Sequence, residues 1–201
     1  MTLEEALEKL SSSNCLKALE LNLAEENVGA KGAQALAEAL KSEKGPSELE
    51  LDLSSNDIGV QGAKALARAL ASGNCPSGLH LNIDENNIGE KGAQALAEAL
   101  KSGNCPAGLM LDLRLNNIGW IGAKAFASAL ITDSCSPVSM LDIGSNNIND
   151  KGAQALAEAL ESGKCPSGLY LNVNYNEISE KGAQAFAKAL VSGNCPKELS
   201  L

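Results

Sequence analysis

Six cysteines, which could bind zinc or pair as disulfides, are spaced with unusual regularity. They stand 30 or 60 residues apart, at Cys15, Cys75, Cys105, Cys135, Cys165 and Cys195. Gly45 occupies the one gap in this series. The chain has no C-x-x-C pair, and residues that stack in register about 4.8 Å apart with parallel side chains suit a disulfide poorly. The spacing therefore predicts buried free thiols that fill a small slot at each turn, a role that Gly45 can share.

His80 is the only histidine, and a histidine beside a carboxylate can take part in catalysis,. Asp52 or Asp84 could neighbour it on one face, but we find no nucleophile or oxyanion donor to complete a site. The sequence therefore predicts no catalytic residue and no enzyme activity, and we expect His80 to be a surface contact.

Asp112 and Asp142 stand one period apart and could together hold a cation. Two carboxylates without further placed oxygens make a weak site, so we predict no metal and no cofactor. We expect these aspartates to belong to a solvated hydrogen-bonding ladder with the equivalent residues Asn22, Asp52, Asn82 and Asn172.

An internal repeat predicts the elements that position these residues. The string KGAQALAEAL begins at Lys31, Lys91 and Lys151, and variants of it stand in the other three copies. The period is 30 residues, with no insertion.

Each copy combines two patterns. Residues 79–83 alternate as LHLNI, which predicts a strand with one buried face,. Residues 92–100 place apolar side chains at helical spacing, and the SGNCP stretch that follows contains the Gly and Pro that end helices,. Such units bury their apolar faces only by stacking. The sequence therefore predicts an α/β solenoid, with a parallel sheet on the concave face and helices on the convex face.

The repeat also carries a family pattern, L-x-(L/I/V)-x-x-N-x-I. It is present at Leu51, Leu53, Asn56 and Ile58 and recurs to Leu171, Val173, Asn176 and Ile178. This pattern resembles the ribonuclease-inhibitor-like class of leucine-rich repeats over nearly the whole chain. The resemblance implies a horseshoe-shaped solenoid. It also implies an asparagine column that turns inward and satisfies backbone groups of the adjacent repeat, at Asn56, Asn86, Asn116, Asn146 and Asn176. Glu26 takes that place in the first repeat, so we expect its turn to be held differently.

The two ends of the repeat array differ. Thr2 to Glu5 fit a capping box, and the residues after it form an apolar helix stripe,. We therefore predict a helical half-repeat cap over residues 1–14, followed by six repeats and a truncated strand over residues 15–201. Because solenoid ends need caps, we expect either a fragment or a last strand, ending at Leu201, that pairs with something else.

Positions that vary in a regular repeat are free to specialise. The column on the inner face changes from acidic to apolar and aromatic, in the order Glu20, Glu50, His80, Met110, Met140 and Tyr170. Tyr, Trp, Arg and Met are enriched at interface centres. We therefore predict a partner-binding surface made of His80, Met110, Arg114, Leu115, Trp120, Ile121, Met140, Tyr170 and Tyr175.

The overall charge narrows the class of partner. A net charge of −9 with only two arginines argues against nucleic acid and against an anionic membrane surface,. No apolar run approaches the roughly 20 residues that span a bilayer. The acidic N-terminus lacks the features of a signal peptide. We expect a soluble chain in a reducing cytoplasm.

Three functions remain in competition. The first is a protein-interaction scaffold that binds a protein on its concave face. With its nearly unchanged repeats and its lack of a signal peptide, the chain resembles most the effectors that intracellular bacteria deliver into host cells. This resemblance implies that the protein works in the cytosol of a host cell. The second is a GTPase regulator, since Ran GTPase-activating proteins share this repeat type, with Arg114 as the residue to test. The third is a passive spacer or dimerisation module that self-associates weakly through its C-terminal edge.

Overall fold

The computed structural model describes residues 1–12, 17–41, 46, 48–133, 135 and 138–195. Within these residues, six strands form one parallel sheet in chain order, and seven helices alternate with them. The strands are β1 (Ala18–Asn22), β2 (Glu48–Asp52), β3 (His80–Asn82), β4 (Leu109–Asp112), β5 (Val138–Asp142) and β6 (Tyr170–Asn172). The helices are α1 (Leu3–Ser12), α2 (Gly29–Leu40), α3 (Gly59–Leu70), α4 (Gly89–Lys101), α5 (Gly119–Leu130), α6 (Asn149–Glu161) and α7 (Glu180–Val191).

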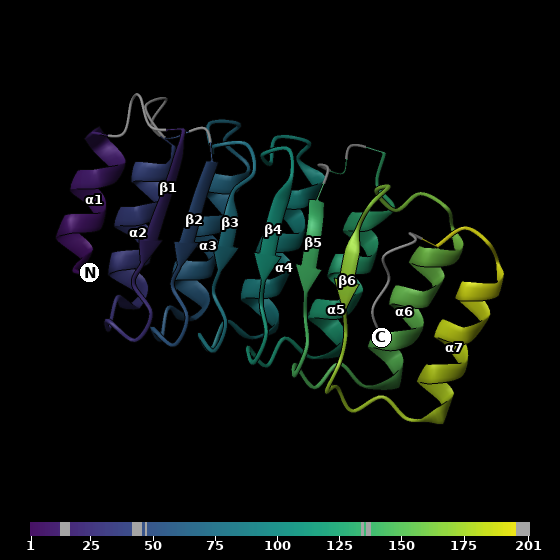
Figure 1. Ribbon diagram of the computed structural model, residues 1–201. Helices are drawn as coiled ribbons and strands as arrows, with labels where there is room; N and C mark the ends of the chain where they lie inside the picture. The colour runs from purple at the N-terminus through teal and green to yellow at the C-terminus, as the bar shows by residue number, and fades with distance from the viewer. Residues whose placement is uncertain (13–16, 42–45, 47, 134, 136–137, 196–201) are drawn as a thin grey trace.

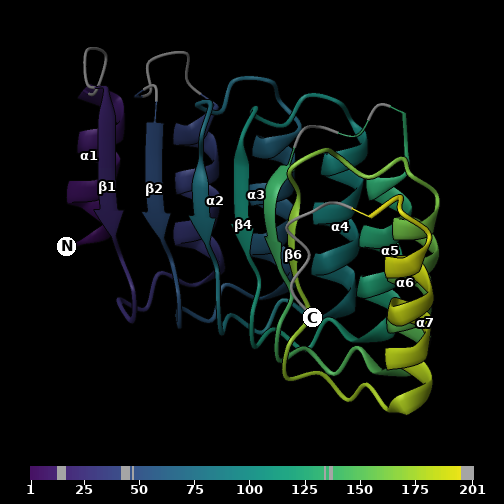
Figure 2. The same ribbon diagram turned by 45° about the vertical axis from the view of Figure 1, so that its right-hand side comes forward.

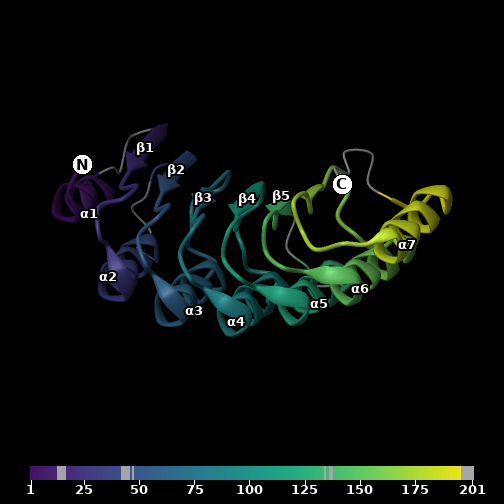
Figure 3. The ribbon, with the colours of Figure 1, turned by 90° about the horizontal axis from the view of Figure 1, so that it is seen from below.

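The elements form two layers that curve together. The strands line the inner side of an arc and helices α2 to α7 its outer side (Figures 1 and 3). Each strand runs down to a loop at its carboxyl end, and the following helix returns behind the sheet (Figure 2). The predicted α/β repeat solenoid is confirmed. Its inner face is the broad sheet surface that helices leave uncovered.

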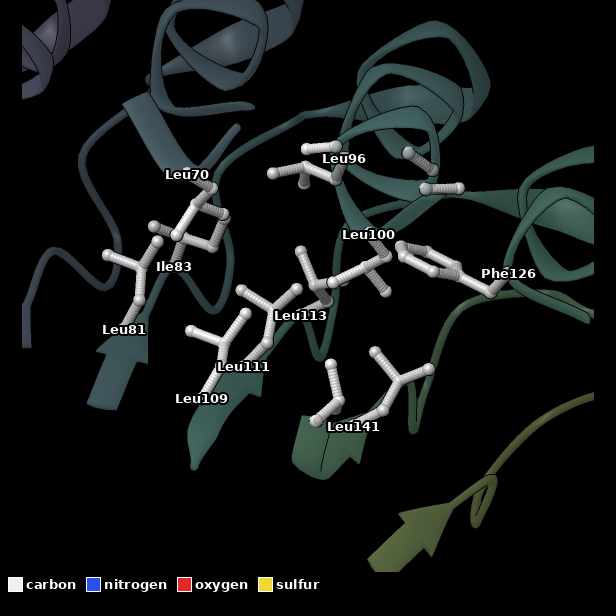
Figure 4. Packing of buried hydrophobic residues seen from close by; sticks show 14 of the residues in the cluster. Leu70, Leu81, Ile83, Leu96, Leu100, Leu109, Leu111, Leu113, Phe126 and Leu141 are labelled. Atoms are coloured by element: carbon white, nitrogen blue, oxygen red, sulfur yellow. The ribbon is translucent and has the colours of Figure 1, made fainter. Parts of the chain in front are cut away.

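The core between the two layers is aliphatic. Every second strand residue points outward to the helices, so that Leu109 and Leu111 of β4 are fully buried while Met110 between them faces the inner side. They pack with Leu100 of α4 and with Phe126 of α5 (Figure 4). Burial of each such side chain contributes about 1.5–3 kcal/mol. The regular core fixes the sheet, and the sheet in turn presents the residues between the leucines.

The buried asparagine column holds neighbouring repeats together. The side chain of Asn86 is fully buried, and its Oδ1 accepts the backbone N–H groups of Asn56 and Ile58 at 3.1 and 3.2 Å. Its Nδ2 donates to the carbonyls of Leu53 and Asp84, both at 2.8 Å. Equivalent bonds recur at Asn116, Asn146 and Asn176, while Asn56 accepts the N–H of Val28 and donates to the carbonyl of Leu23. The inward orientation that the resemblance implies is confirmed.

Each asparagine thus holds the turn of the repeat before it, which explains the exception in the first repeat. Glu26 is exposed, and its carboxylate lies 3.5 Å from the amino group of Met1. Asn56 of the second repeat accepts the N–H of Val28 at 2.9 Å and so secures the first turn. The first repeat therefore needs no asparagine of its own.

One departure from strict register lies between β4 and β5. Residues 30 apart were expected to stack throughout, yet Leu109 pairs with Val138 and Met110 with Met140, with a register shift between them. Ser139 is exposed, whereas Val138 is buried and fills the core position that leucine occupies in other repeats. Burying the apolar valine in place of a serine favours this bulge.

The first helix begins as predicted. The N–H of Thr2 donates to Glu5 at 2.8 Å and the N–H of Glu5 donates back to the threonine hydroxyl at 3.2 Å, which is a capping box,. Helix α1 packs against α2. The strand predicted to end at Leu201 lies outside the described residues. None of the helices in the described ranges has the length and apolar character needed to cross a membrane.

We predict that Asn86→Ala lowers the free energy of unfolding by about 3 kcal/mol, because it leaves several buried backbone groups without partners. Urea unfolding followed by circular dichroism measures the change. The control is Asn104→Ala, since Asn104 is exposed and its side chain donates to the carbonyl of Ala71, at 3.2 Å. We expect it to cost less than about 1 kcal/mol. Equal losses in the two variants would contradict the role of the column.

Candidate binding surface

Four of the predicted contact residues form one row across the sheet. His80, Met110, Met140 and Tyr170 occupy directly paired positions on β3, β4, β5 and β6. The first three are half-buried, and Tyr170 is 38 % exposed. The structure therefore brings these residues together on the inner face, as the sequence predicted.

Leu115 and Tyr175 lie in the loops that follow β4 and β6, at equivalent positions two repeats apart. They are 50 % and 91 % exposed. Both have left-handed backbone, with φ of 52° and 57°. This conformation costs a residue with a Cβ atom roughly 1–2 kcal/mol. The other repeats carry only Glu or Ser at this position, at Glu25, Ser55, Glu85 and Ser145. Two bulky apolar side chains thus stand in solvent on strained backbone.

Arg114 is tied to the sheet by carboxylates rather than projecting freely. Its Nε donates to both oxygens of Asp112 at 3.0 Å, and its Nη2 lies 2.7 Å from Asp112 Oδ2. The carboxylates of Asp84 and Asp142 lie 3.6 and 3.9 Å from the same guanidinium. Arg114 is therefore the shared counter-ion of three aspartates, a role that the sequence did not predict for it.

The prediction of a solvated ladder is therefore only partly right. Asp112 and Asp142 do form hydrogen bonds, each accepting the N–H two residues ahead, and Asn172 donates to Asp142 at 2.9 Å. However, Asp112 and Asp142 are only 6 % and 8 % exposed, so they are not solvated. The Arg114 side chain folds back over them, which could not be read from periodicity because arginine occurs once in its column.

The electrostatics of this cluster are set by burial and by the single cation. Desolvation raises the pKa of Asp84, and the positive charge of Arg114 partly opposes that rise. The hydrogen bond to Asp112 raises the pKa of Arg114. Oδ1 of Asp84 is buried and has no hydrogen-bond partner among the described residues. Arg114 is thus the cation that the three carboxylates share.

His80 has a different neighbour from the aspartates expected beside it. Its Nδ1 lies 3.6 Å from Oε1 of Glu50, the residue opposite it on β2. Glu50 belongs to a hollow over the first strands that the sequence analysis did not single out. The acidic end of the inner-face column was the signal that could have located it.

Trp120 and Ile121 are not part of the row on the sheet. They lie in the first turn of α5, in the outer layer, and both are half-buried. The ammonium of Lys151 lies 5.2 Å from the centre of the Trp120 ring, close enough for a cation–π contact,. A partner seated on the sheet reaches these two residues only if it extends over the edge.

The cysteines that the structure describes are free thiols. Cys75 and Cys105 are buried and donate to the carbonyls of Ala69 and Ala99, both at 3.3 Å, so the prediction holds for them. The later three, Cys135, Cys165 and Cys195, are only half-buried. Burial raises the pKa of Cys75 to about 12. Cys15 and Gly45 lie outside the described residues.

In the described ranges, no group of three or more His, Cys, Asp or Glu side chains is placed to hold a metal ion.

The architecture and the repeat pattern together define a class. The family described as Leucine Rich repeat matches residues 49–67, 79–97, 110–127, 135–157 and 169–187. This chain is a leucine-rich-repeat protein.

Solved structures agree with this assignment. The leiomodin-1 actin-binding site 2 is similar in structure, with a TM-score of 0.55 and 19 % sequence identity over 67 % of this chain and 75 % of that one. A likeness at this identity shows the fold alone. In all, 59 chains of solved structures match, so the fold is widely used and does not itself select a function,. No curated protein matches the sequence.

We predict that Cys75 does not react with Ellman's reagent at pH 8 in the folded protein, because its thiol is buried and its pKa is raised to about 12,. It should react at once in urea. Mass spectrometry of labelled peptides distinguishes it from Cys195, which is half-buried and should be modified first. Labelling of both at one rate in the folded state would contradict the prediction.

We predict that Arg114→Ala lowers the free energy of unfolding at pH 7 by about 1–2 kcal/mol, because it leaves three carboxylates without their cation. Removing the positive charge raises the pKa of Asp84 further. A carboxyl group with a raised folded-state pKa destabilises the fold when ionised, and this effect disappears as pH falls below its unfolded value, about 4. The deficit should therefore shrink between pH 7 and pH 4.

The matched control is Arg68→Ala, since Arg68 is exposed on α3 and is the other arginine of the chain. We expect a change below about 0.5 kcal/mol at both pH values. Urea unfolding at each pH measures the two variants. A deficit for Arg114→Ala that does not depend on pH would be inconsistent with the carboxylate cluster.

Proposed function

We propose that this protein is an interaction scaffold that binds a protein partner on its concave face. The contact surface runs along the row from Met110 to Tyr170 and continues to Leu115 and Tyr175 at the carboxyl ends of the strands. Its leucine-rich-repeat fold supports a binding role, because such solenoids offer extended concave surfaces. The proposed contacts are made by side chains between the core leucines, where substitution leaves the fold intact.

The exposure of Tyr175 is the observation that carries this proposal. The ring is 91 % exposed on backbone with φ of 57°. The left-handed backbone is shared with the Glu and Ser of the other repeats, so what sets Tyr175 apart is a large aromatic side chain that folding does not bury. Exposed apolar residues that gather on one surface mark interaction sites. Tyr170 and Leu115 are exposed on the same half of the solenoid.

The proposal also includes the subtype of leucine-rich repeat, the cellular location of the protein and the class of its partner. The α-helix on the outer side of every repeat and the period of 30 residues support the ribonuclease-inhibitor-like subtype. The resemblance to bacterial effectors rests on the fidelity of the repeats. A reducing cytoplasmic location is supported by the free thiols,. We expect no nucleic-acid or membrane partner, because the net charge is −9,.

A GTPase-regulating function is the first alternative, and it would depend on Arg114. The contacts described above weigh against it, because this guanidinium is already bound to Asp112 and shared with two further carboxylates. Reaching a bound nucleotide would require breaking all three contacts.

Self-association is the second alternative, and a specific feature favours it. A hollow of about 310 Å³ lies between α6 and α7, but a more apolar one of about 230 Å³ is lined by Val173, Tyr175, Ile178 and Phe186 at the last repeat. A second copy could insert there. Because Tyr175 belongs to both surfaces, the oligomeric state has to be measured together with partner binding.

We predict that Tyr170→Ala/Tyr175→Ala folds normally but loses its partners in quantitative affinity capture from cell lysate. Both side chains are exposed, so their removal costs little stability, whereas interface aromatics often contribute 2 kcal/mol or more,. The matched control is Leu190→Ala/Val191→Ala, which removes two exposed apolar side chains at the end of α7.

The proposal fails if the tyrosine variant captures the same proteins as the unmodified chain, or if both variants lose them equally. Light scattering of the same three proteins separates the alternatives. A dimer that disappears only in the tyrosine variant assigns Tyr175 to self-association instead.

A further inference from the structure

The inner face of the sheet is uncovered and hollowed over its first strands. A depression of about 540 Å³ spans β1, β2, β3 and the start of β4. Small residues, Ala18 and Gly78, leave the space open, and Met110 borders it on the side of the aromatic row. The charged groups in its lining are Glu20, Glu48 and Glu50, with His80 beside them. Lysine and arginine are absent from this lining within the part of the chain that the structure describes.

Among the described residues, these glutamates lie close together with no lysine or arginine between them. Glu20 on β1 and Glu50 on β2 are directly paired in the sheet. Like charges in such positions destabilise a sheet. Among the described residues, Glu20 and Glu48 form no ion pair, and Glu50 faces only His80, at 3.6 Å. In the part of the chain that the structure describes, the repulsion between these exposed carboxylates is reduced only by solvent and by His80,.

The other end of the same sheet shows how this chain relieves such a repulsion. Asp112 and Asp142 are also directly paired, on β4 and β5, and Arg114 is placed between them. No equivalent arginine serves the first two strands, where Ala24 and Ser54 stand in the Arg114 column. Within the ranges that the structure describes, no lysine or arginine complements Glu20 and Glu50, so a cationic group of a partner could do so.

We propose that the hollow over β1 to β3 binds a lysine- or arginine-rich segment of the partner protein. This rests on the proposed scaffold function and adds the chemistry of the partner. Cationic head groups bridge Glu20, Glu48 and Glu50, while their aliphatic stems lie along the side chain of Met110. The partner thus presents basic residues to the N-terminal half of the arc and apolar ones to Met140 and Tyr170.

The probe is a short fluorescein-labelled peptide in which lysine and leucine alternate, titrated against the full chain and followed by fluorescence anisotropy. We expect binding that weakens with salt, and none by the same peptide with glutamate in place of lysine. In Glu20→Gln/Glu48→Gln/Glu50→Gln, affinity should fall about tenfold. This variant also loses the cross-strand repulsion, so its thermal midpoint should equal or exceed that of the unmodified chain.

The matched control is Glu38→Gln/Glu98→Gln/Glu158→Gln, which removes the same charge from exposed positions on α2, α4 and α6. Its affinity should stay within about twofold, since these charges lie on the far side of the solenoid. Equal loss in both triple variants would overturn the proposal, because attraction would then follow overall charge. Undiminished binding by the inner-face variant, or no binding to the unmodified chain, would overturn it as well.

These outcomes are separate from a failure of the scaffold function. The tyrosine variant keeps all three glutamates, so it should bind the lysine peptide like the unmodified chain. If it did so while still capturing the same lysate proteins, the aromatic surface would be wrong and the acidic hollow would stand.

Discussion

The inward hydrogen bonding of the asparagine column is the interaction on which the remaining structure depends. Every repeat turns twice, and the turn after each strand carries its backbone groups into a dry interior where unpaired donors are costly. From the second repeat on, one asparagine satisfies groups of its own turn and of the preceding one. Asn86 does so for Asp84 in its own turn and for Leu53, Asn56 and Ile58 in the preceding one. Because the bonds cross from repeat to repeat, they impose a common spacing on the strands. Because of this common spacing, a residue lies beside the residues at the same position in the adjacent repeats.

This rule explains which parts of the structure could be predicted from the sequence. The row from His80 to Tyr170 follows from the period alone, since equivalent residues must stack. The register shift at Val138 could not be predicted, because it depends on a local competition between a valine and Ser139 for one core position. The burial of Asp112 and Asp142 was missed for a related reason. A long side chain, Arg114, bends across two repeats, and periodicity carries no information about such a contact.

The acidic residues on the inner face of the sheet are balanced differently at its two ends. Parallel strands held in register force identical columns into contact, so acidic columns repel. At the C-terminal half the chain supplies its own cation, and the cluster is closed by contacts among Asp84, Asp112, Asp142 and Arg114. At the N-terminal half Glu20 and Glu50 are paired, and no lysine or arginine of the described residues lies between them. The first arrangement neutralises charge within the chain, whereas the second is the one that we propose a cationic segment of a partner complements.

Strain and repulsion therefore point to function more sharply here than composition does. The repeat has Glu or Ser on left-handed backbone at four positions, where the glutamates are exposed and the serines half-buried. Leu115 and Tyr175 have the same backbone conformation, but their side chains are large and apolar. These side chains are exposed, so they are neither buried in the core nor well solvated. In a solenoid whose core columns are nearly uniform, a costly departure at an exposed position has no folding benefit to offset it. We propose that a contact made outside the chain is the reason for these side chains, and the uncovered inner face of the sheet offers a surface for it.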